Sequence, residues 1–141
     1  MRWDFPGVLT PPEAAALAAD VGYLGFDDPR LTGIVSKVRD VAPVVLSGPS
    51  YVRVEKNKAG HPWHCDRGAR DHMRWCRYSG GCLLVPPDRF TGGGVYFRDR
   101  GPVFHYLDFL FWDSDQDNEH RVAGNSGERI CLIMFFGATD G

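Results

Sequence analysis

Two histidines and one aspartate are the residues of this sequence that together can hold a catalytic metal. His64 and Asp66 stand two positions apart, so on a strand their side chains share one face and both reach a single ion. His120 supplies a second imidazole from a later segment. Two imidazoles and one carboxylate form a facial triad that suits iron(II), although zinc, cobalt and nickel accept the same donors. We therefore predict His64, Asp66 and His120 as metal ligands.

His61 lies close to His64 in the sequence and is a competing ligand. A regular strand places it on the face opposite His64 and Asp66. The sequence therefore favours His61 as a pocket-lining or solvated side chain.

Arg129 is the candidate group for binding a carboxylate beside this metal. If Asn125 and Ser126 are the two loop residues of a hairpin, Val122 lies opposite Arg129, and Arg129 shares a face with His120. The guanidinium then stands one strand away and about 7 Å along from the metal ligand. It can grip a carboxylate with two parallel hydrogen bonds, as the far end of a metal-chelating five-carbon diacid requires. A shift by one residue turns Arg129 to the other face, so the prediction depends on this turn.

The elements that position these residues are two helices followed by many short strands. A capping pattern, Thr10-Pro11-Pro12-Glu13, starts a helix that continues over residues 14–21, and a second helix is predicted from Asp27 to about Val38. From residue 50 onward strands alternate with turn residues. The predicted strands cover residues 51–55, 63–66, 73–78, 82–85, 95–98, 103–106, 109–112, 120–123 and 130–136, with turns at 80–81, 86–88, 91–94 and 124–127. The expected fold is mostly β, two N-terminal helices supporting an antiparallel core of about eight strands, the scale of a jelly roll.

The sequence resembles the prolyl-hydroxylase-like branch of the iron(II)/2-oxoglutarate oxygenases over residues 51–136. Four features in the same order carry the resemblance: His64-Cys65-Asp66, the glycine-rich stretch Gly92-Gly93-Gly94-Val95-Tyr96-Phe97, the segment from Phe109-Leu110-Phe111-Trp112 to His120-Arg121-Val122, and Gly127-Glu128-Arg129. The resemblance implies a double-stranded β-helix of the cupin-like, jelly-roll kind. It implies one domain over residues 1–141, with 1–47 as helical support and 48–141 as the core.

The resemblance also implies an activity and its cofactors. Iron(II), 2-oxoglutarate and O₂ are expected, with 2-oxoglutarate converted to succinate and CO₂ while an unactivated C–H bond is hydroxylated. An intact Asp66 favours hydroxylation over halogenation, and Arg129 is expected to bind the distal carboxylate of 2-oxoglutarate. Family tyrosines that contact 2-oxoglutarate have Val54 and Val85 at the nearest positions here, so Tyr51 or Tyr78 is the expected substitute.

The substrate is expected to be an amino acid, a peptide or protein side chain, or a small natural product. Trp63 flanks the predicted metal site and is a candidate pocket wall. Arg74 is a candidate contact for an anionic substrate, as one of a basic cluster whose alternative role is a solvated surface: Arg67, Arg70, Arg74 and Arg77.

Bulk properties exclude several functional classes. The formal net charge of −2 gives no basic field for nucleic acid or an anionic membrane. Phe135 stands where nucleic-acid-demethylating relatives usually carry a second arginine, which argues further against base repair. No apolar run is long enough to cross a bilayer and no signal peptide is evident, so a cytoplasmic protein with free thiols is expected.

Two alternative functions remain open from the sequence. One is a non-catalytic β-barrel module that uses the same three ligands for a metal. The other is a cupin-type oxygenase that does not use 2-oxoglutarate. Arg129 favours the 2-oxoglutarate enzyme, because a structural metal site needs no carboxylate-binding group beside it.

Overall fold

The computed structural model describes residues 2–42, 45–67, 74–114 and 118–138. Over these residues the chain is mostly β, with two short α-helices and antiparallel sheets, as the sequence predicts. No helix among them is long and apolar enough to span a membrane. The two predicted helices and the strand-rich region after them are therefore confirmed.

The helices form where capping residues start them. Helix α1 (Pro11–Ala18) begins with a reciprocal cap, in which the Thr10 hydroxyl accepts from the Glu13 amide and the Glu13 carboxylate accepts from the Thr10 amide. Helix α2 (Thr32–Val41) follows the 3₁₀ turn η1 (Pro29–Leu31). Helix α1 ends before the predicted residue 21, and the chain then enters a short strand.

A six-stranded sheet forms the centre of the molecule. Its neighbouring strands are all antiparallel. The strand order is β1 (Arg2–Phe5), β9 (Phe109–Asp113), β5 (Tyr78–Leu83), β12 (Cys131–Ala138), β3 (Leu46–Glu55) and β2 (Gly22–Tyr23). The first 47 residues thus contribute two strands, β1 and β2, besides the helices that the sequence predicts.

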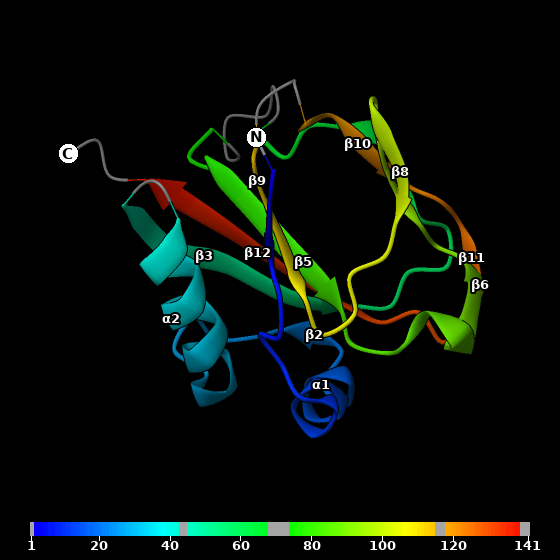
Figure 1. Cartoon of the computed structure of the whole chain (residues 1–141), viewed down its shortest axis with the longest axis horizontal. Coiled ribbons are helices and arrows are strands. Elements are labelled where there is room, and N and C mark those ends of the chain that lie inside the picture. The colour runs from blue at the N-terminus through cyan, green and yellow to red at the C-terminus, as the bar shows by residue number, and fades with distance from the viewer. Residues whose placement is uncertain (1, 43–44, 68–73, 115–117, 139–141) are drawn as a thin grey trace.

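A four-stranded sheet faces the large sheet. It contains, in order, β4 (His61–His64), β10 (His120–Val122), β7 (Val95–Phe97) and β8 (Arg100–Val103). A two-stranded ladder of β11 (Asn125–Gly127) and β6 (Phe90–Gly92) continues beside it, next to the 3₁₀ turn η3 (Pro87–Arg89). Figure 1 shows the helices on one side of the large sheet and these smaller sheets on the other.

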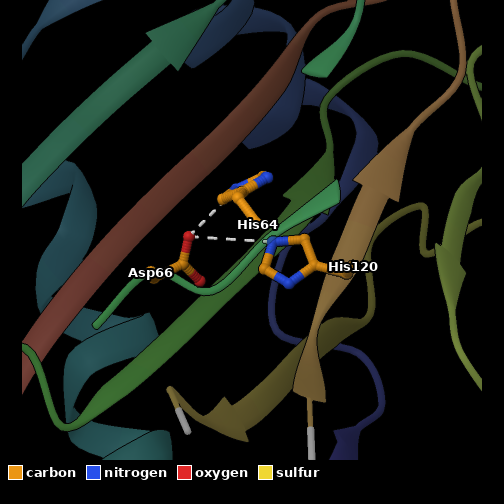
Figure 2. A group of neighbouring side chains, drawn as sticks. All are labelled: His64, Asp66 and His120. Carbon is orange, nitrogen blue, oxygen red and sulfur yellow. Dashed lines mark ion pairs between the residues drawn. The ribbon is translucent and has the colours of Figure 1, made fainter. Parts of the chain in front are cut away.

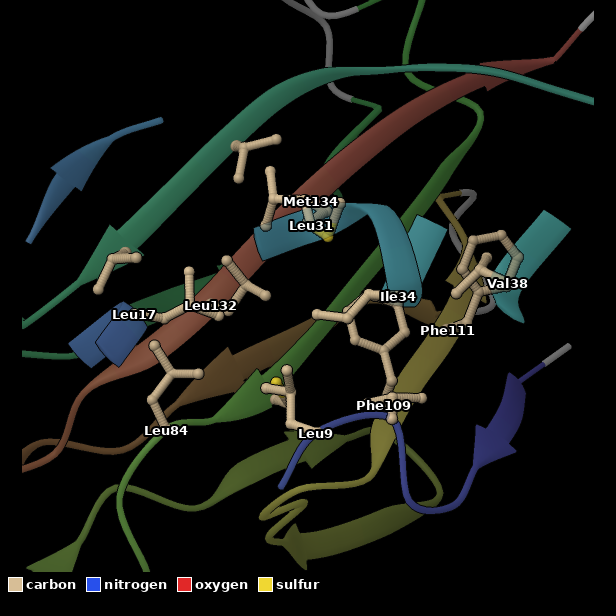
Figure 3. Packing of buried hydrophobic residues seen from close by; sticks show 14 of the residues in the cluster. Leu9, Leu17, Leu31, Ile34, Val38, Leu84, Phe109, Phe111, Leu132 and Met134 are labelled. Atoms are coloured by element: carbon tan, nitrogen blue, oxygen red, sulfur yellow. The ribbon is translucent and has the colours of Figure 1, made fainter. Parts of the chain in front are cut away.

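The large sheet has a hydrophobic core on each face because its strands alternate. Phe109 and Phe111 of β9 are fully buried on the helix side, where they pack with residues such as Leu17 and Ile34 (Figure 3). Leu110 and Trp112 of the same strand point the other way and pack with Phe97 and Val103 of the small sheet. The helix-side core fixes the large sheet, and the second face is left to build a pocket between the sheets.

The predicted turn at residues 80–81 is wrong, because Gly80 and Gly81 lie inside strand β5. Glycine is required there by packing rather than by a turn. A Cβ on Gly80 would lie 2.2 Å from Cε1 of Phe109, and one on Gly81 would lie 2.8 Å from the Leu132 carbonyl oxygen. The strand predicted at 73–78 is also wrong for residues 74–77, which form a turn and coil before β5 starts at Tyr78, and residue 73 lies outside the described residues. The strand predicted at 82–85 is the end of β5, which stops at Leu83.

The predicted hairpin at Asn125–Ser126 is also wrong. Residues Asn125–Gly127 form strand β11, which pairs with β6, and Val122 pairs with Val95. The strands predicted at 63–66 and 103–106 begin and end earlier, as β4 (His61–His64) and β8 (Arg100–Val103).

Replacing Gly80 by alanine is expected to lower the free energy of unfolding by about 1–3 kcal/mol, because the new methyl group overpacks a fixed core ring. Urea denaturation followed by tryptophan fluorescence measures the change. The matched control is Gly33→Ala in α2, where a Cβ meets no atom within 4 Å; helix propensity predicts a gain of up to about 1 kcal/mol there. Wild-type stability of Gly80→Ala would contradict the packing role.

Candidate metal centre

His64, Asp66 and His120 come together in the pocket between the sheets, as Figure 2 shows. Their candidate ligand atoms all lie within 4.8 Å of one another. The Asp66 Oδ1 atom is 3.3 Å from Nε2 of His64 and 3.7 Å from Nε2 of His120. Among the described residues, no other three His, Cys, Asp or Glu side chains lie close enough to one another to hold one ion.

Strand pairing brings the two histidines together. His64 ends β4 and lies directly opposite His120, the first residue of β10. Their ring centroids are 4.4 Å apart. Asp66 lies beyond the end of β4, in a bend, rather than on the same strand as predicted. The backbone amide of Arg67 donates to the Ser114 carbonyl and ties this bend to the chain that follows β9.

Backbone carbonyls orient both imidazoles. Nδ1 of His64 donates to the Pro62 carbonyl at 2.7 Å, and Nδ1 of His120 donates to the Asn118 carbonyl at 2.8 Å. A carbonyl only accepts, so Nδ1 carries a proton in either charge state, and in the neutral ring Nε2 offers a lone pair to the shared site. Hydrogen bonds of this kind are typical of metal-ligating histidines.

Asn118 itself is a positioning residue that the sequence did not single out. It is buried, and its side-chain amide donates to the carbonyl and the carboxylate of Asp113 at 2.9 and 2.6 Å. The His120 ring is held further by Phe97 and Trp112, with ring centroids 5.6 and 5.2 Å away. The second imidazole is therefore fixed before any ligand binds.

The electrostatics of the site keep Asp66 charged. Burial alone would raise the pKa of Asp66, but the hydrogen bond from His64 and the nearby His120 lower it below its ordinary value. The same hydrogen bond raises the pKa of His64, whereas burial lowers the pKa of His120. The second carboxylate oxygen of Asp66, Oδ2, is buried and has no hydrogen-bond partner.

These residues fit a divalent metal ion. A buried carboxylate oxygen without a partner costs about 1–3 kcal/mol, and a cation would satisfy it. The donor set of two imidazole nitrogens and one carboxylate, without thiolate, is the set found in non-haem iron(II) oxygenases.

Arg129 lies in the same pocket and is buried. Its Nε donates to the Gly93 carbonyl at 2.8 Å, and Nη1 approaches Sγ of Cys131 at 3.6 Å. Gly93 has a φ of 73°, and a Cβ there would lie 2.5 Å from Cδ of Arg129. A larger residue at this position would therefore displace the guanidinium.

No protein-family model and no curated protein matches the sequence. Solved structures do match. A viral collagen prolyl hydroxylase from Paramecium bursaria Chlorella virus-1, in complex with 2-oxoglutarate, has a TM-score of 0.72 at 13% identity, covering 99% of this chain and 96% of that one. The chain has the fold of the prolyl-hydroxylase-like iron(II)/2-oxoglutarate oxygenases.

Two further structures with this oxygenase fold differ in what they bind. A prolyl hydroxylase from Trichoplax adhaerens, in complex with a hypoxia-inducible-factor peptide, has a TM-score of 0.67 at 13% identity, covering 97% of this chain and 83% of that one. HygX from Streptomyces hygroscopicus, with nickel and 2-oxoglutarate bound, has a TM-score of 0.63 at 16% identity, covering 99% of this chain and 82% of that one.

Within this oxygenase fold, Arg129 lines the predicted pocket, but the predicted hairpin is not what places it there. The predicted hairpin does not form, and Arg129 lies in the connection between β11 and β12. It enters the pocket because Gly93 leaves room for its side chain.

His61 also lines the pocket, because β4 contains a bulge. The pairs His120–His64 and Val122–His61 advance two residues on β10 and three on β4, and this extra residue turns His61 to the pocket side. The predicted opposite face is therefore wrong, while the predicted lining role is confirmed. Nε2 of His61 donates to the buried carboxylate of Glu55 at 2.7 Å.

The other predicted site residues lie in the pocket, in the helix-side core or on the surface. Tyr51 lines the pocket, but the Tyr78 ring stacks on Phe111 in the helix-side core, with centroids 5.3 Å apart. Trp63 is not part of the pocket lining; the Arg98 guanidinium covers its ring at 3.7 Å. Arg74 is exposed in a separate surface groove, which it shares with Arg67 and Arg77. Arg70 lies outside the described residues.

The four cysteines are free thiols, as expected. Cys131 lines the pocket beside Arg129, and Cys82 lies on the neighbouring strand. Burial raises the pKa of both thiols, and neither belongs to the described group of side chains that could hold a metal ion.

Replacing either His64 or His120 by alanine is expected to weaken cobalt(II) or iron(II) binding by more than about 100-fold, since changes to outer hydrogen-bond partners alone cost about 10–100-fold. Anaerobic isothermal titration calorimetry measures the affinity. His61→Gln is the control, because glutamine can still donate to Glu55 and the residue is not part of the ligand group. An unchanged metal affinity in His64→Ala, or a loss of affinity in His61→Gln as large as that expected for His64→Ala, would contradict the assignment of the metal ligands.

Proposed function

We propose that this protein is an iron(II)- and 2-oxoglutarate-dependent dioxygenase that hydroxylates an unactivated C–H bond. The observation that carries the proposal is the buried guanidinium of Arg129 in the same pocket as the His64, Asp66 and His120 group. A metal-binding group alone is compatible with many functions. A buried cation aimed into the same pocket calls for an anionic cosubstrate, and the fold is one in which 2-oxoglutarate binds.

In the proposed enzyme, His64, Asp66 and His120 hold iron(II). The bound iron would supply, with O₂, the oxidative conversion of 2-oxoglutarate to succinate and CO₂, coupled to insertion of one oxygen atom into a C–H bond of the substrate. The protein positions the reacting groups and keeps water away from them. Leu110, Trp112 and Val95 line the pocket with apolar surface, which excludes water and strengthens the electrostatic interactions inside it.

Arg129 is proposed to bind the distal carboxylate of 2-oxoglutarate. Its Nε is already committed to the Gly93 carbonyl, which fixes the plane of the guanidinium. Among the described residues no carboxylate forms an ion pair with Arg129, so the remaining N–H groups can serve a ligand. A guanidinium held in this way loses little side-chain entropy when it binds a carboxylate.

We propose further that the two facing sheets are the double-stranded β-helix, or jelly roll, of this enzyme class, in a single domain. Antiparallel strands and a ligand pocket between the sheets support this topology. The proposed substrate is an amino acid, a peptide or protein side chain, or a small natural product. The peptide held by the Trichoplax structure shows that this fold accommodates a polypeptide in one case.

The alternative functions explain less of the pocket. A non-catalytic metal module gives no role to Arg129. A cupin-type oxygenase usually uses more histidine ligands, and the further histidine near this site, His61, is paired with Glu55.

Anaerobic titration of the iron(II) protein with 2-oxoglutarate tests the proposal, because the chelate gives a weak visible charge-transfer band. The band is expected for the wild-type protein. For Arg129→Gln the dissociation constant of 2-oxoglutarate should rise by at least about 30-fold, since losing one partner of a buried charge pair costs about 2 kcal/mol or more. Iron affinity should stay the same.

The matched control is Arg121→Gln, which removes an arginine next to His120 whose side chain lies over the Tyr96 ring, outside the pocket lining. This variant should bind 2-oxoglutarate like the wild type. An iron-loaded wild-type protein without the band, and without 2-oxoglutarate-dependent succinate formation, would refute the oxygenase.

A further inference from the structure

A second arginine, Arg53, lines the pocket and has no role in the proposed cosubstrate site. It lies on β3 between Tyr51 and Glu55, and these three side chains line the pocket while Val52 and Val54 are buried in the helix-side core. On the β12–β3 ladder Arg53 pairs with Ile133, whereas Glu55 pairs with Cys131, the residue beside Arg129. Neighbouring residues on one face of a strand are about 6.5–7 Å apart, so the two arginines are separate anchors.

Within the described residues, Arg53 forms no ion pair with a carboxylate. Its Cζ lies 5.4 Å from the centroid of the Tyr23 ring, and Tyr51 and Glu55 line the pocket on either side of it. The neighbouring carboxylate, Glu55, lies 2.7 Å from Nε2 of His61, and its interaction with Arg53 is electrostatic, without an ion-pair contact. Arg53 is therefore a positioned cation in a half-buried pocket wall, with N–H donors left for a ligand.

An aromatic surface lies beside Arg53. Phe135 and Tyr51 are partners on the β12–β3 ladder, and their rings stack with centroids 4.8 Å apart and planes 18° apart. Tyr23 of β2 meets Tyr51 edge-on at 5.4 Å and is 70% exposed, so the ladder of rings runs from the pocket out to the sheet edge. On the other side of β12 the pocket wall includes Gly81, which pairs with Ile133 and brings no side chain into this space.

We propose that the substrate of this site carries a carboxylate or phosphate group, which Arg53 binds, next to a flat apolar or aromatic part that packs on Phe135 and Tyr51. A cation that makes no ion-pair contact in a partly desolvated wall selects an anionic ligand, and a guanidinium fits either oxyanion with paired hydrogen bonds. The stacked rings select a flat neighbour to that anion, because aromatic groups prefer offset stacking. This inference rests on the proposed function for the role of the pocket, but its residues are distinct from the metal ligands and from Arg129.

The test uses three small probes of one shape: phenylacetate, phenyl phosphate and the neutral phenylacetamide. They are titrated calorimetrically into the full-length protein loaded with cobalt(II) and 2-oxoglutarate, without oxygen. The wild type should bind one or both of the anions at least about tenfold more tightly than it binds phenylacetamide. This is the gain in affinity expected from a charge-assisted hydrogen bond. The anion that binds more tightly identifies the oxyanion that the site prefers.

Arg53→Gln should lose this preference by about tenfold or more while binding phenylacetamide and 2-oxoglutarate as the wild type does. Arg121→Gln is the matched control and should keep the preference, because it removes a positive charge near the metal but outside the pocket lining. An unchanged preference in Arg53→Gln would overturn the proposal. An equal loss of 2-oxoglutarate affinity in Arg53→Gln would also overturn it, because Arg53 would then belong to the cosubstrate site.

A second titration, without metal and 2-oxoglutarate, separates this proposal from the proposed function. If the metal-loaded wild type fails to bind 2-oxoglutarate, the proposed oxygenase is refuted. The second titration can still measure the anion preference in that case. The Arg53 anchor predicts that this preference disappears in Arg53→Gln and persists in Arg129→Gln. The opposite pattern would overturn it.

Discussion

The cross-strand pair of His64 and His120 is the constraint on which the rest of the site depends. One register of β4 against β10 places the two imidazoles opposite each other, and two backbone carbonyls then direct both Nε2 atoms toward Asp66. The result is a buried carboxylate with one oxygen between two imidazoles and the other without a partner. Such an arrangement is costly in the metal-free protein and favourable once a cation satisfies the free oxygen.

The large sheet supports this arrangement from the other side of the pocket. Its helix-side core, built around Phe109 and Phe111, leaves the opposite face free for functional side chains. That face presents Arg53 and Glu55 from β3, with Arg129 just before β12. The pocket therefore has a candidate metal group at the paired ends of β4 and β10 and two separate cationic groups, Arg53 on β3 of the large sheet and Arg129 in the connection that leads into β12. In the proposed enzyme, this division would give the cosubstrate and the substrate different places to bind.

The residue types and order in the sequence were enough to predict the metal group and the mostly β fold. Histidine and aspartate in a short motif, a distant histidine and the helix caps are all local signals. The sequence did not predict features that depend on long-range packing. Gly80 and Gly81 look like a turn, but they are in a strand because Phe109 and the Leu132 carbonyl occupy the space of a side chain.

Other errors came from register. The bulge that turns His61 into the pocket requires knowledge of the pairing between β4 and β10, which a regular alternation cannot supply. The predicted hairpin placed Arg129 in the pocket through an incorrect pairing, since β11 pairs with β6. The glycine-rich stretch contained the signal that explains its position, because Gly93 is the residue that the guanidinium packs against. Arg53 and Asn118 carried no motif, and only their neighbours in space reveal their roles.

A crystal structure of the protein with manganese(II) and 2-oxoglutarate, prepared without oxygen, would show which residues hold the metal and the cosubstrate. We expect one metal ion bound by Nε2 of His64, Nε2 of His120 and the Asp66 carboxylate. We also expect the distal carboxylate of 2-oxoglutarate on Arg129, with Arg53 left to the substrate. A metal ion held by other residues, or a 2-oxoglutarate carboxylate on Arg53, would contradict the proposed site.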